Sequence, residues 1–382
     1  MEGSRTKSFE RPGASSTRAR WWRGIALGQV CAFANASSAL ASTALERRRV
    51  YLPAWQTFFA YVAIGLVYAP MYVERLRAAG RGAYSWSKAK KYCALALIDA
   101  EANYLMTLSF RFTSMTSVSL LDNAAIPFAM GMSWIALRAR YAEAHVVGAV
   151  VALGGISFLI LSDAASKGAS TAVKANAPLG DFLCVTAAAM YATSNVLAES
   201  FLKDSDRIEV LAHLGVLGAG ISGAQSAIIE GMNSKELAIL GPAGVGLFAA
   251  YAAALFFMYT FSMDVLERCG ASAFNVSMLA SDVWAVIFRL IFFSGFASGA
   301  HAMFFGISFA LVAIGIAVFA SAGDPGGQGF EYGVNLESTA DDTPAWITAV
   351  RNFVRSGPTE VPYVVMDANY DLEPVELGSL GR

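Results

Sequence analysis

Acidic and amide side chains interrupt long apolar segments of this sequence. In the segment 92–110, Asp99 and Asn103 lie on the same face of a helix, with Tyr104 beside them. Glu101 points to nearly the opposite face. A carboxylate among apolar residues of a membrane segment marks a functional site, where it accepts hydrogen bonds from a polar solute or carries a proton.

The segment 113–137 carries Asp122 and Asn123 near its middle, shortly before Pro127. A proline frees backbone polar groups of a helix, and these groups are tolerated inside a membrane only against protein or water. We therefore expect Asp122 and Asn123 to line an internal cavity.

A polar stripe follows the segment 271–294. Asn275, Asp282 and Arg289 recur at every seventh residue, so they drift by only about 40° around a helix. Asn275 and Asp282 are predicted to face the cavity. The alternative is hydrogen bonding between helices, with Arg289 reaching the membrane surface.

The segments 24–45 and 179–199 carry matching stripes, related by a shift of 153 residues: Ser38, Ser42, Glu46 and Tyr191, Asn195, Glu199. Tyrosine and tryptophan rings would offer stacking surfaces to a ring-shaped solute. The candidate substrate-binding residues are Asp99, Asn103, Tyr104, Asp122, Asn123, Tyr191, Asn195, Asn275, Asp282 and Trp284.

Charged residues at the segment ends form two candidate gates. Glu46 with Arg111 would close the outer mouth, and Glu199 with Arg268 would close the inner mouth. The alternative is four unconnected interfacial charges, because surface ion pairs are weak.

The composition indicates which kind of secondary structure positions these residues. The chain of 382 residues is 56% hydrophobic and 15% charged, with a mean hydropathy of +0.49. Soluble domains carry about 25% charged residues, so a soluble enzyme is excluded. Apolar windows predict ten transmembrane helices, which are 24–45, 51–73, 92–110, 113–137, 144–162, 179–199, 210–229, 241–263, 271–294 and 301–322.

Two halves of the chain resemble each other at an offset of 152 to 158 residues. Leu27-Gly28-Gln29 recurs as Leu179-Gly180-Asp181, and Val118-Ser119-Leu120-Leu121 recurs as Val276-Ser277-Met278-Leu279. Each half then holds five spans, and an odd number inserts the second half in the opposite direction. The fold class is therefore an all-α integral membrane protein with ten transmembrane helices as two inverted five-helix repeats, an arrangement that favours transport.

Most of the 28 Lys and Arg residues fall on one side of the membrane if both termini are cytosolic. The predicted domains are a disordered cytoplasmic arm (1–23), a first repeat (24–162), a non-cytoplasmic loop (163–178), a second repeat (179–322) and a disordered acidic cytoplasmic tail (323–382). We expect an endomembrane or the plasma membrane. A plastid envelope is the weaker alternative, drawn from the Ser, Thr and Arg of the N-terminus.

No motif of a soluble or membrane enzyme is present: the sequence has no nucleophile elbow, phosphate-binding glycine loop or His-Glu-x-x-His run. The four cysteines lack metal-ligand spacing, so we expect no metal, no cofactor and no catalytic residue. The net charge of −1 argues against nucleic-acid binding.

Several runs carry a family resemblance over residues 24 to 322. They are Asp99-Ala100-Glu101-Ala102-Asn103-Tyr104, Leu120-Leu121-Asp122 with Ile126-Pro127, Tyr191-Ala192-Thr193-Ser194-Asn195-Val196, and Asn275-Val276 with Ser281-Asp282. With them the chain resembles solute carrier family 35, subfamily F, of the drug/metabolite transporter superfamily. The resemblance implies a ten-span inverted-repeat transporter for solutes of the nucleoside, nucleobase-like or nucleotide-sugar class.

The sequence thus predicts a secondary transporter that moves a small polar organic solute by alternating access and has the lipid bilayer as its surroundings. The rival interpretation is a non-transporting membrane receptor, or a trafficking or scaffold protein, on the same fold. A homodimer is left open.

Overall fold

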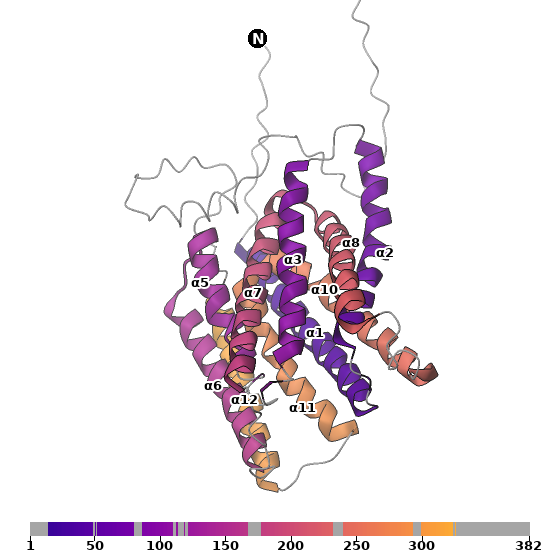
Figure 1. Cartoon of the computed structure of the whole chain (residues 1–382). Coiled ribbons are helices and arrows are strands. Elements are labelled where there is room, and N and C mark those ends of the chain that lie inside the picture. The colour runs from indigo at the N-terminus through magenta and orange to yellow at the C-terminus, as the bar shows by residue number, and fades with distance from the viewer. Residues whose placement is uncertain are drawn as a thin grey trace, which may run out of the picture.

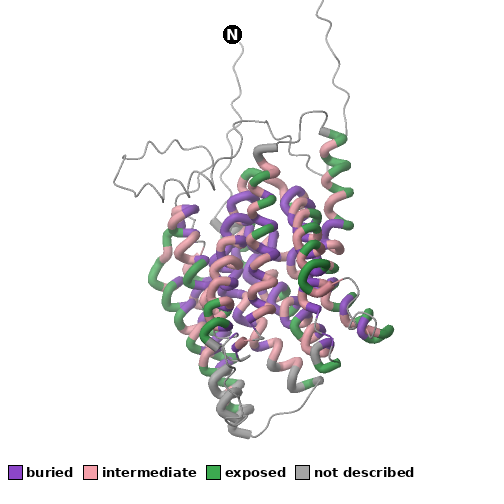
Figure 2. Tube along the Cα trace, viewed as in Figure 1, coloured by how far each residue is buried: buried purple, intermediate pink, exposed green. Residues whose placement is uncertain are grey.

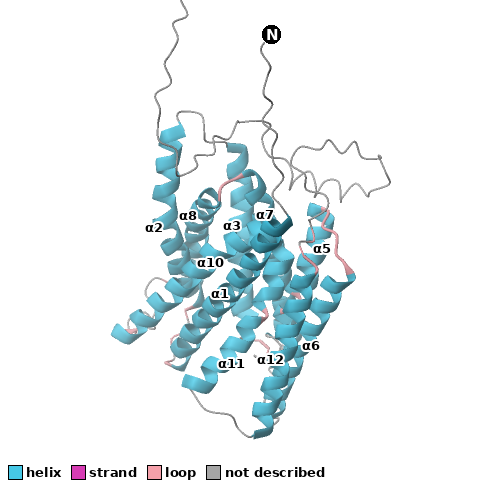
Figure 3. Cartoon of the chain, turned by 180° about the vertical axis from the view of Figure 1, so that it is seen from behind, coloured by secondary structure: helices cyan, strands magenta, loops and turns pink. Residues whose placement is uncertain are grey.

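The computed structural model describes residues 14–48, 50, 52–79, 86–109, 112–113, 118, 121–166, 177–231, 240–292, 299–323 and 325. Within these ranges the chain is all-helical, as Figures 1 and 3 show from opposite sides. Ten α-helices and one π-helical turn are described: α1 (Ala14–Arg47), α2 (Pro53–Ala79), α3 (Trp86–Ser109), α5 (Ala125–Leu137), α6 (Glu143–Ser166), α7 (Ala177–Asp204), α8 (Arg207–Gln225), η1 (Ser226–Glu230), α10 (Gly241–Met278), α11 (Ala280–Phe292) and α12 (Gly299–Ser321).

Five of these helices are long and apolar enough to cross a membrane by length and composition. They cover Arg18–Leu45, Pro53–Ala78, Pro178–Asp204, Arg207–Glu230 and Gly241–Met278. Three shorter apolar stretches are Ala125–Leu137, Glu143–Phe158 and Gly306–Ser321. Figure 2 shows buried residues in the middle of the bundle and exposed ones along its sides. Many large exposed side chains are apolar, such as Leu66 and Val150, as a lipid-facing surface requires.

The N-terminal helix begins earlier than the sequence predicts. Residues 14–23, assigned to the cytoplasmic arm, form the first turns of α1. Trp21 stabilises this extension, since it is buried and its indole Nε1 donates a 2.7 Å hydrogen bond to the backbone oxygen of Ala320 on α12. The remainder of the predicted arm, most of the loop 163–178 and nearly all of the tail 323–382 lie outside the described residues.

Helix α10 runs through residues that the sequence assigns to a loop and contains a break at Gly270. The φ angle of Gly270 is 78°, in the left-handed region that glycine adopts without strain. Just past the break, the backbone N–H of Ala271 donates a 2.7 Å hydrogen bond to Glu199 Oε2 on α7. A carboxylate at this position caps the second stretch of α10, because the first N–H groups of a helix lack partners within it.

Contacts with α1 show that the chain reverses direction at this break. The stretch before Gly270 runs antiparallel to α1, and the stretch after it, continued by α11, runs parallel to α1. The contacts are Arg20 with Glu267 and Cys31 with Met258 for the first stretch, and Gly28 with Ser277 and Phe33 with Trp284 for the second. Helix α10 therefore consists of two oppositely directed arms, one on each side of Gly270.

Two other helix pairs approach through glycine. Helices α2 and α8 cross so closely that a Cβ atom on Gly215 would lie 2.4 Å from the backbone nitrogen of Gly65. Helices α6 and α12 meet in the same way, since a Cβ atom on Gly148 would lie 2.4 Å from the backbone nitrogen of Phe319. Small residues permit this spacing, which apolar packing between membrane helices exploits.

Two helices are interrupted near their middle. In the predicted span 113–137 the helical residues Leu121 and Asp122 are followed by a turn at 123–124, and α5 begins only at Ala125. In the predicted span 271–294 a turn at Leu279 separates α10 from α11. Leu121 and Leu279 are equivalent in the repeated run, so the turn at 123–124 lies two to three residues further along its half than the turn at Leu279, whose φ of −55° and ψ of −30° stay in the helical region.

Candidate functional site

The carboxylate of Asp99 lies at the centre of the bundle, with 4% of its surface exposed. Its Oδ2 atom accepts hydrogen bonds from the hydroxyls of Tyr61 on α2 (2.5 Å) and Tyr259 on α10 (2.7 Å). Its Oδ1 atom accepts one from the hydroxyl of Ser194 on α7 (2.8 Å). Four helices are thus joined at one carboxylate, and three hydroxyl donors replace the water that an isolated buried charge would lack.

Asn103 extends this group of hydrogen bonds by one helical turn of α3. Its Nδ2 atom lies 3.1 Å from the hydroxyl oxygen of Tyr61 and 3.2 Å from that of Tyr259. The hydroxyl of Tyr191 on α7 donates to Asn103 Oδ1 over 2.9 Å. The donors therefore point in one direction, from Tyr191 through Asn103 and the two tyrosines toward Asp99.

The predicted pairing of Asp99 and Asn103 on one helix face therefore brings them into one polar cluster, together with Tyr191. Tyr61 and Tyr259 belong to the same cluster, and sequence reasoning missed both. Tyr61 lies in an apolar run, and Tyr259 follows one with only Thr260 and Ser262 close by, so both tyrosines look like ordinary packing residues. The only available signal was that a buried tyrosine hydroxyl usually has a polar partner.

A second acidic group lies at the two helix interruptions. Asp122, just before the turn at 123–124, has an exposed side chain, in contrast to Asp99. Asp122 and Asp282 are close enough for their charges to interact, and the side chain of Asn123 is within hydrogen-bonding reach of the Asp282 carboxylate. Residues from two broken helices, far apart in sequence, thus meet in one place.

The remaining amide candidates form a link between α7 and α10. Asn195 Nδ2 lies 3.4 Å from Asn275 Oδ1, and Asn275 Nδ2 donates a 2.8 Å hydrogen bond to the backbone oxygen of Ala271. Asn275 is buried. This geometry matches the hydrogen bonding between helices that the sequence left open as the alternative for Asn275.

The two remaining aromatic candidates, Tyr104 and Trp284, lie on α3 and α11. Trp284 on α11 packs against Phe33 of α1, with ring centroids 5.2 Å apart and planes at 89°, and against Phe288. Tyr104 is half-buried on α3. Glu101, predicted to face away from Asp99, accepts a 2.7 Å hydrogen bond from Gln225 of α8.

The candidate gate residues are only partly described. The side chain of Glu46 and the whole of Arg111 lie outside the described residues. Glu199 caps Ala271 and forms an ion pair with Lys203 (3.3 Å). Arg268 forms an ion pair with Asp264 (3.6 Å). The two predicted gate pairs stay predictions.

A protein metal site usually needs at least three His, Cys, Asp or Glu side chains close together. No such group occurs among the residues that the structure describes. The four cysteines, Cys31, Cys93, Cys184 and Cys269, are free thiols.

Comparison with known proteins identifies relatives that all belong to one family. A family model described as solute carrier family 35 (subfamily F) matches residues 17–321. Mouse solute carrier family 35 member F2 is 32% identical over 298 residues, which cover 78% of each chain. The member F2 protein of Xenopus tropicalis is 30% identical over 295 residues, covering 75% of each chain.

A fungal relative and a solved structure extend this result. An uncharacterized solute carrier family 35 member of Schizosaccharomyces pombe is 28% identical over 360 residues, covering 92% of this chain and 66% of its own. A crystal structure with 17% sequence identity superposes with a TM-score of 0.58 over 81% of this chain and 98% of its own, which shows a shared fold. Because the family model spans most of the sequence, the chain belongs to solute carrier family 35, subfamily F.

Proposed function

We propose that this protein is a secondary transporter that moves a small polar organic solute across a membrane by alternating access, without chemistry on the solute. Membership of a solute carrier family supports the coarse assignment. The observation that carries the proposal is the meeting of Asp122, Asn123 and Asp282 at two interrupted helices. Transporters of inverted-repeat folds build their solute sites at such interruptions, near the middle of the bilayer.

The contacts between helices support two inverted repeats of five spans. With α10 counted as two arms, α2 and α8 are the second and seventh spans, and α6 and α12 are the fifth and tenth. Each of these pairs joins equivalent spans of the two halves and packs in antiparallel fashion. A two-fold axis in the membrane plane would produce this pattern.

A further pair of contacts repeats between the halves. Gly24 of α1 lies against Cys269, just before the turn at Gly270. Gly180 of α7 lies against Thr113, at the junction between the third and fourth predicted spans. The shift of 157 residues that relates Arg111 to Arg268 takes Thr113 to Gly270. The repeated run pairs Gly180 with Gly28, one helical turn beyond Gly24, so the first and sixth spans contact similar regions of the two halves about one turn apart.

The two acidic groups have different parts in this proposal. Asp99 has protein partners on both oxygens, so it holds α2, α3, α7 and α10 in register around the site. Asp122 is exposed, and within the described residues no hydrogen bond or ion pair satisfies its carboxylate. We therefore place the solute beside Asp122 and Asp282, with Tyr191 as the side chain that links this site to the Asp99 cluster.

The charges favour some solutes over others. A nucleotide sugar carries a diphosphate, which needs cationic partners. Among the described residues, no Lys or Arg has a hydrogen bond or ion pair with the Asp99 cluster or with Asp122 and Asp282. An uncharged or cationic solute of the nucleoside or nucleobase-like class fits this environment better.

Uptake into proteoliposomes tests the proposal. Purified protein is reconstituted and offered a labelled panel of nucleosides, nucleobases and nucleotide sugars at several pH gradients. We expect uptake of at least one solute by the wild-type protein and its loss in Asp122→Asn and in Asp282→Asn at equal reconstitution. Asp204→Asn, which changes an exposed acid at the end of α7, is the matched control.

The outcomes separate the transporter from its rival. Unchanged kinetics in both Asp122→Asn and Asp282→Asn would remove the solute site from this position. Absence of uptake for the whole panel, from protein that is folded and reconstituted, would favour the receptor or scaffold interpretation.

A further inference from the structure

We propose that Asp264 holds the bundle closed at the end where α8 meets α10, and that breaking its ion pair with Arg207 shifts the protein toward a state open at that end. This inference rests on the alternating access of the proposed function. It differs from the gate predicted from the sequence, in which Glu199 and Arg268 form the inner pair.

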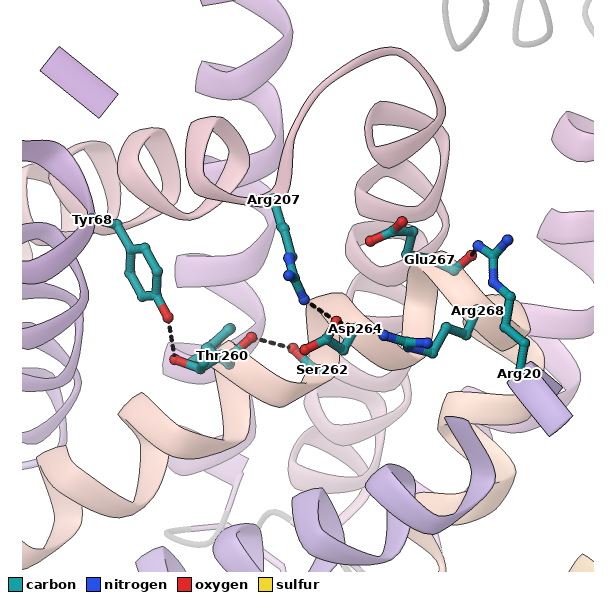
Figure 4. A network of polar contacts seen from close by, with 9 residues as sticks. Arg20, Tyr68, Arg207, Thr260, Ser262, Asp264, Glu267 and Arg268 are labelled. Carbon is teal, nitrogen blue, oxygen red and sulfur yellow. Dashed lines mark hydrogen bonds and ion pairs between the residues drawn. The ribbon is translucent and has the colours of Figure 1, made fainter. Parts of the chain in front are cut away.

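The geometry around Asp264 links two helices through charge. Asp264 lies on α10, shortly before the reversal at Gly270, and its carboxylate pairs with Arg207, the first residue of α8. Arg268, one turn further along α10, lies 3.6 Å from the same carboxylate. Figure 4 shows Arg207 reaching across from α8 to Asp264. The Asp264 side chain is 16% exposed, so the pair is screened less than ion pairs on an open surface.

Two neighbouring contacts join further helices to the same stretch of α10. The hydroxyl of Tyr68 on α2 donates a 2.9 Å hydrogen bond to Thr260 Oγ1. The guanidinium of Arg20 on α1 donates a 3.1 Å hydrogen bond to the backbone oxygen of Glu267. Both contacts are visible beside the ion pair in Figure 4. The stretch from Thr260 to Arg268 thus closes against α1, α2 and α8 together.

Apart from Arg268–Asp264 within α10 and Lys203–Glu199 within α7, the other ion pairs between described residues lie at the same end of the bundle and leave α10 out. Arg75 on α2 pairs with Asp206, in the linker before α8, and Lys88 on α3 lies 3.7 Å from Glu209 on α8. Within the part of the chain that the structure describes, the pair Arg207–Asp264 is the one salt bridge that connects α10 to another helix. Separation of α10 from α8 therefore has to break it.

The equivalent positions at the opposite end cannot form such a pair. The shift of 157 residues that relates Arg268 to Arg111 takes Asp264 to Thr107, whose hydroxyl donates to the backbone oxygen of Asn103 in its own helix (2.8 Å). The shift of 153 residues that relates Glu199 to Glu46 takes Arg207 to Ala54, which carries no charge. Closure at the Asp264 end has an attractive interaction that these positions of the other half cannot make. The Arg207–Asp264 pair therefore stabilises the state closed at its own end, and these positions of the other half supply no counterpart.

A thiol reporter next to the ion pair tests this inference without any solute. Ser262 on α10 is buried, lies between Asp264 and Tyr259, and hydrogen-bonds only to the backbone oxygen of Tyr259 in its own helix. Ser262→Cys is introduced into a Cys93→Ser background, because Cys93 is the exposed native thiol and Cys31, Cys184 and Cys269 are buried. Purified protein in lipid nanodiscs is treated with a water-soluble maleimide, and mass spectrometry follows the rate of modification at position 262.

Arg207→Gln and Asp264→Asn should each raise the modification rate at position 262 by about fivefold, which corresponds to the upper range measured for partly exposed ion pairs. The double variant should be modified no faster than either single variant, because both substitutions remove the same interaction. Lys203→Ala is the matched control, since it removes an ion pair at the same end that lies within α7 alone.

Unchanged modification rates in both single variants would overturn the inference. Additive increases in the double variant, or an equal increase in Lys203→Ala, would also overturn it, because they would show general loosening and no specific pair. If Asp264→Asn does not fold, Arg207→Gln carries the test, since the Arg207 side chain is 44% exposed. A positive result with no uptake in proteoliposomes would leave this equilibrium in place and remove the transport proposal.

Discussion

Ser194 on α7 and Asp99 on α3 lie 2.8 Å apart, oxygen to oxygen, in the middle of the bundle. The hydroxyl donates to the carboxylate, and Tyr61 and Tyr259 donate to the other carboxylate oxygen. An acid that would be costly alone in a membrane protein is satisfied by three neutral donors from three helices. Asp99 therefore serves mainly as a contact between helices. Its role differs from that of Asp122, whose side chain is exposed.

Removing one of these donors should destabilise the protein. Tyr259→Phe deletes the hydroxyl that lies 2.7 Å from Asp99 Oδ2 and 3.2 Å from Asn103 Nδ2. We expect a loss of about 1 to 3 kcal/mol in stability, because the buried carboxylate is left with one donor fewer. Thermal unfolding in detergent, followed by tryptophan fluorescence, measures the effect.

Tyr104→Phe provides the control for this experiment, since no hydrogen bond of the Tyr104 hydroxyl is found among the described residues. Its unfolding temperature should stay close to that of the wild-type protein. Equal unfolding temperatures for Tyr259→Phe and wild type would show that the hydrogen bonds to Asp99 contribute little.

The acids Asp99 and Asp122 should respond differently to the same substitution. Asp99→Asn replaces one of the two acceptor oxygens by an amide donor that faces a hydroxyl donor, so it should lower stability by about 1 to 3 kcal/mol. Asp122→Asn changes an exposed side chain and should shift stability by less than about 0.5 kcal/mol.

Unfolding curves of the two variants, recorded side by side with uptake in proteoliposomes, check this contrast. The expected pattern is a stable Asp122→Asn protein without uptake and an unstable Asp99→Asn protein. A fully stable Asp99→Asn protein would contradict the role of the Asp99 cluster in holding the four helices together.

The crossing of α2 and α8 should tolerate no added methyl group. Gly215→Ala would place a Cβ atom 2.4 Å from the backbone nitrogen of Gly65, and backbone cannot move aside without separating the helices. We expect a loss of about 1 to 3 kcal/mol, the cost of overpacking. Gly220→Ala, on the same helix and with open space around its Cβ position, should be neutral or slightly stabilising. Equal unfolding temperatures of the two variants would mean that the helices do not approach this closely.

The reversal at Gly270 should depend on glycine. Gly270→Ala forces a residue with a Cβ atom into a backbone with φ of 78°, and this atom would lie 3.0 Å from Glu199 Oε2. The left-handed conformation costs roughly 1 to 2 kcal/mol for a residue other than glycine. Gly246→Ala, in the same helix and with open space, is the control. If Gly270→Ala unfolds at the same temperature as Gly246→Ala, the turn between the two arms of α10 has another conformation.

Much of the architecture could be predicted from spacing and composition. The predicted segments 144–162, 179–199 and 210–229 fall within helices of the structure, and 53–73 of the segment 51–73 does so too, because an apolar run in a membrane must be helical over its length. The predicted face shared by Asp99 and Asn103 is real as well, since both contact Tyr61 and Tyr259. Helix periodicity alone determines which residues of one helix point the same way.

The boundaries of other segments could not be predicted. The extension of α1 to Ala14 depends on the contact between Trp21 and Ala320, nearly the whole repeat region away in sequence. The predicted loop between 263 and 271 is instead part of α10. The chain turns there at the single left-handed residue Gly270, and Glu199 caps the helical stretch after Gly270. Hydropathy carries no information about such contacts, because it averages over many residues.

By itself the sequence determined the class of protein, most of the helical segments and the acids within the apolar runs, because burial in a membrane leaves few alternatives for backbone and charge. Only the tertiary structure decided the partners of those acids. In the tertiary structure, Asp99 accepts hydrogen bonds from Tyr61, Tyr259 and Ser194. Asp122 is exposed near Asp282, and Arg207 forms an ion pair with Asp264. The physical reason is that periodicity orients a side chain on its own helix, whereas its partner is chosen by how separate helices pack.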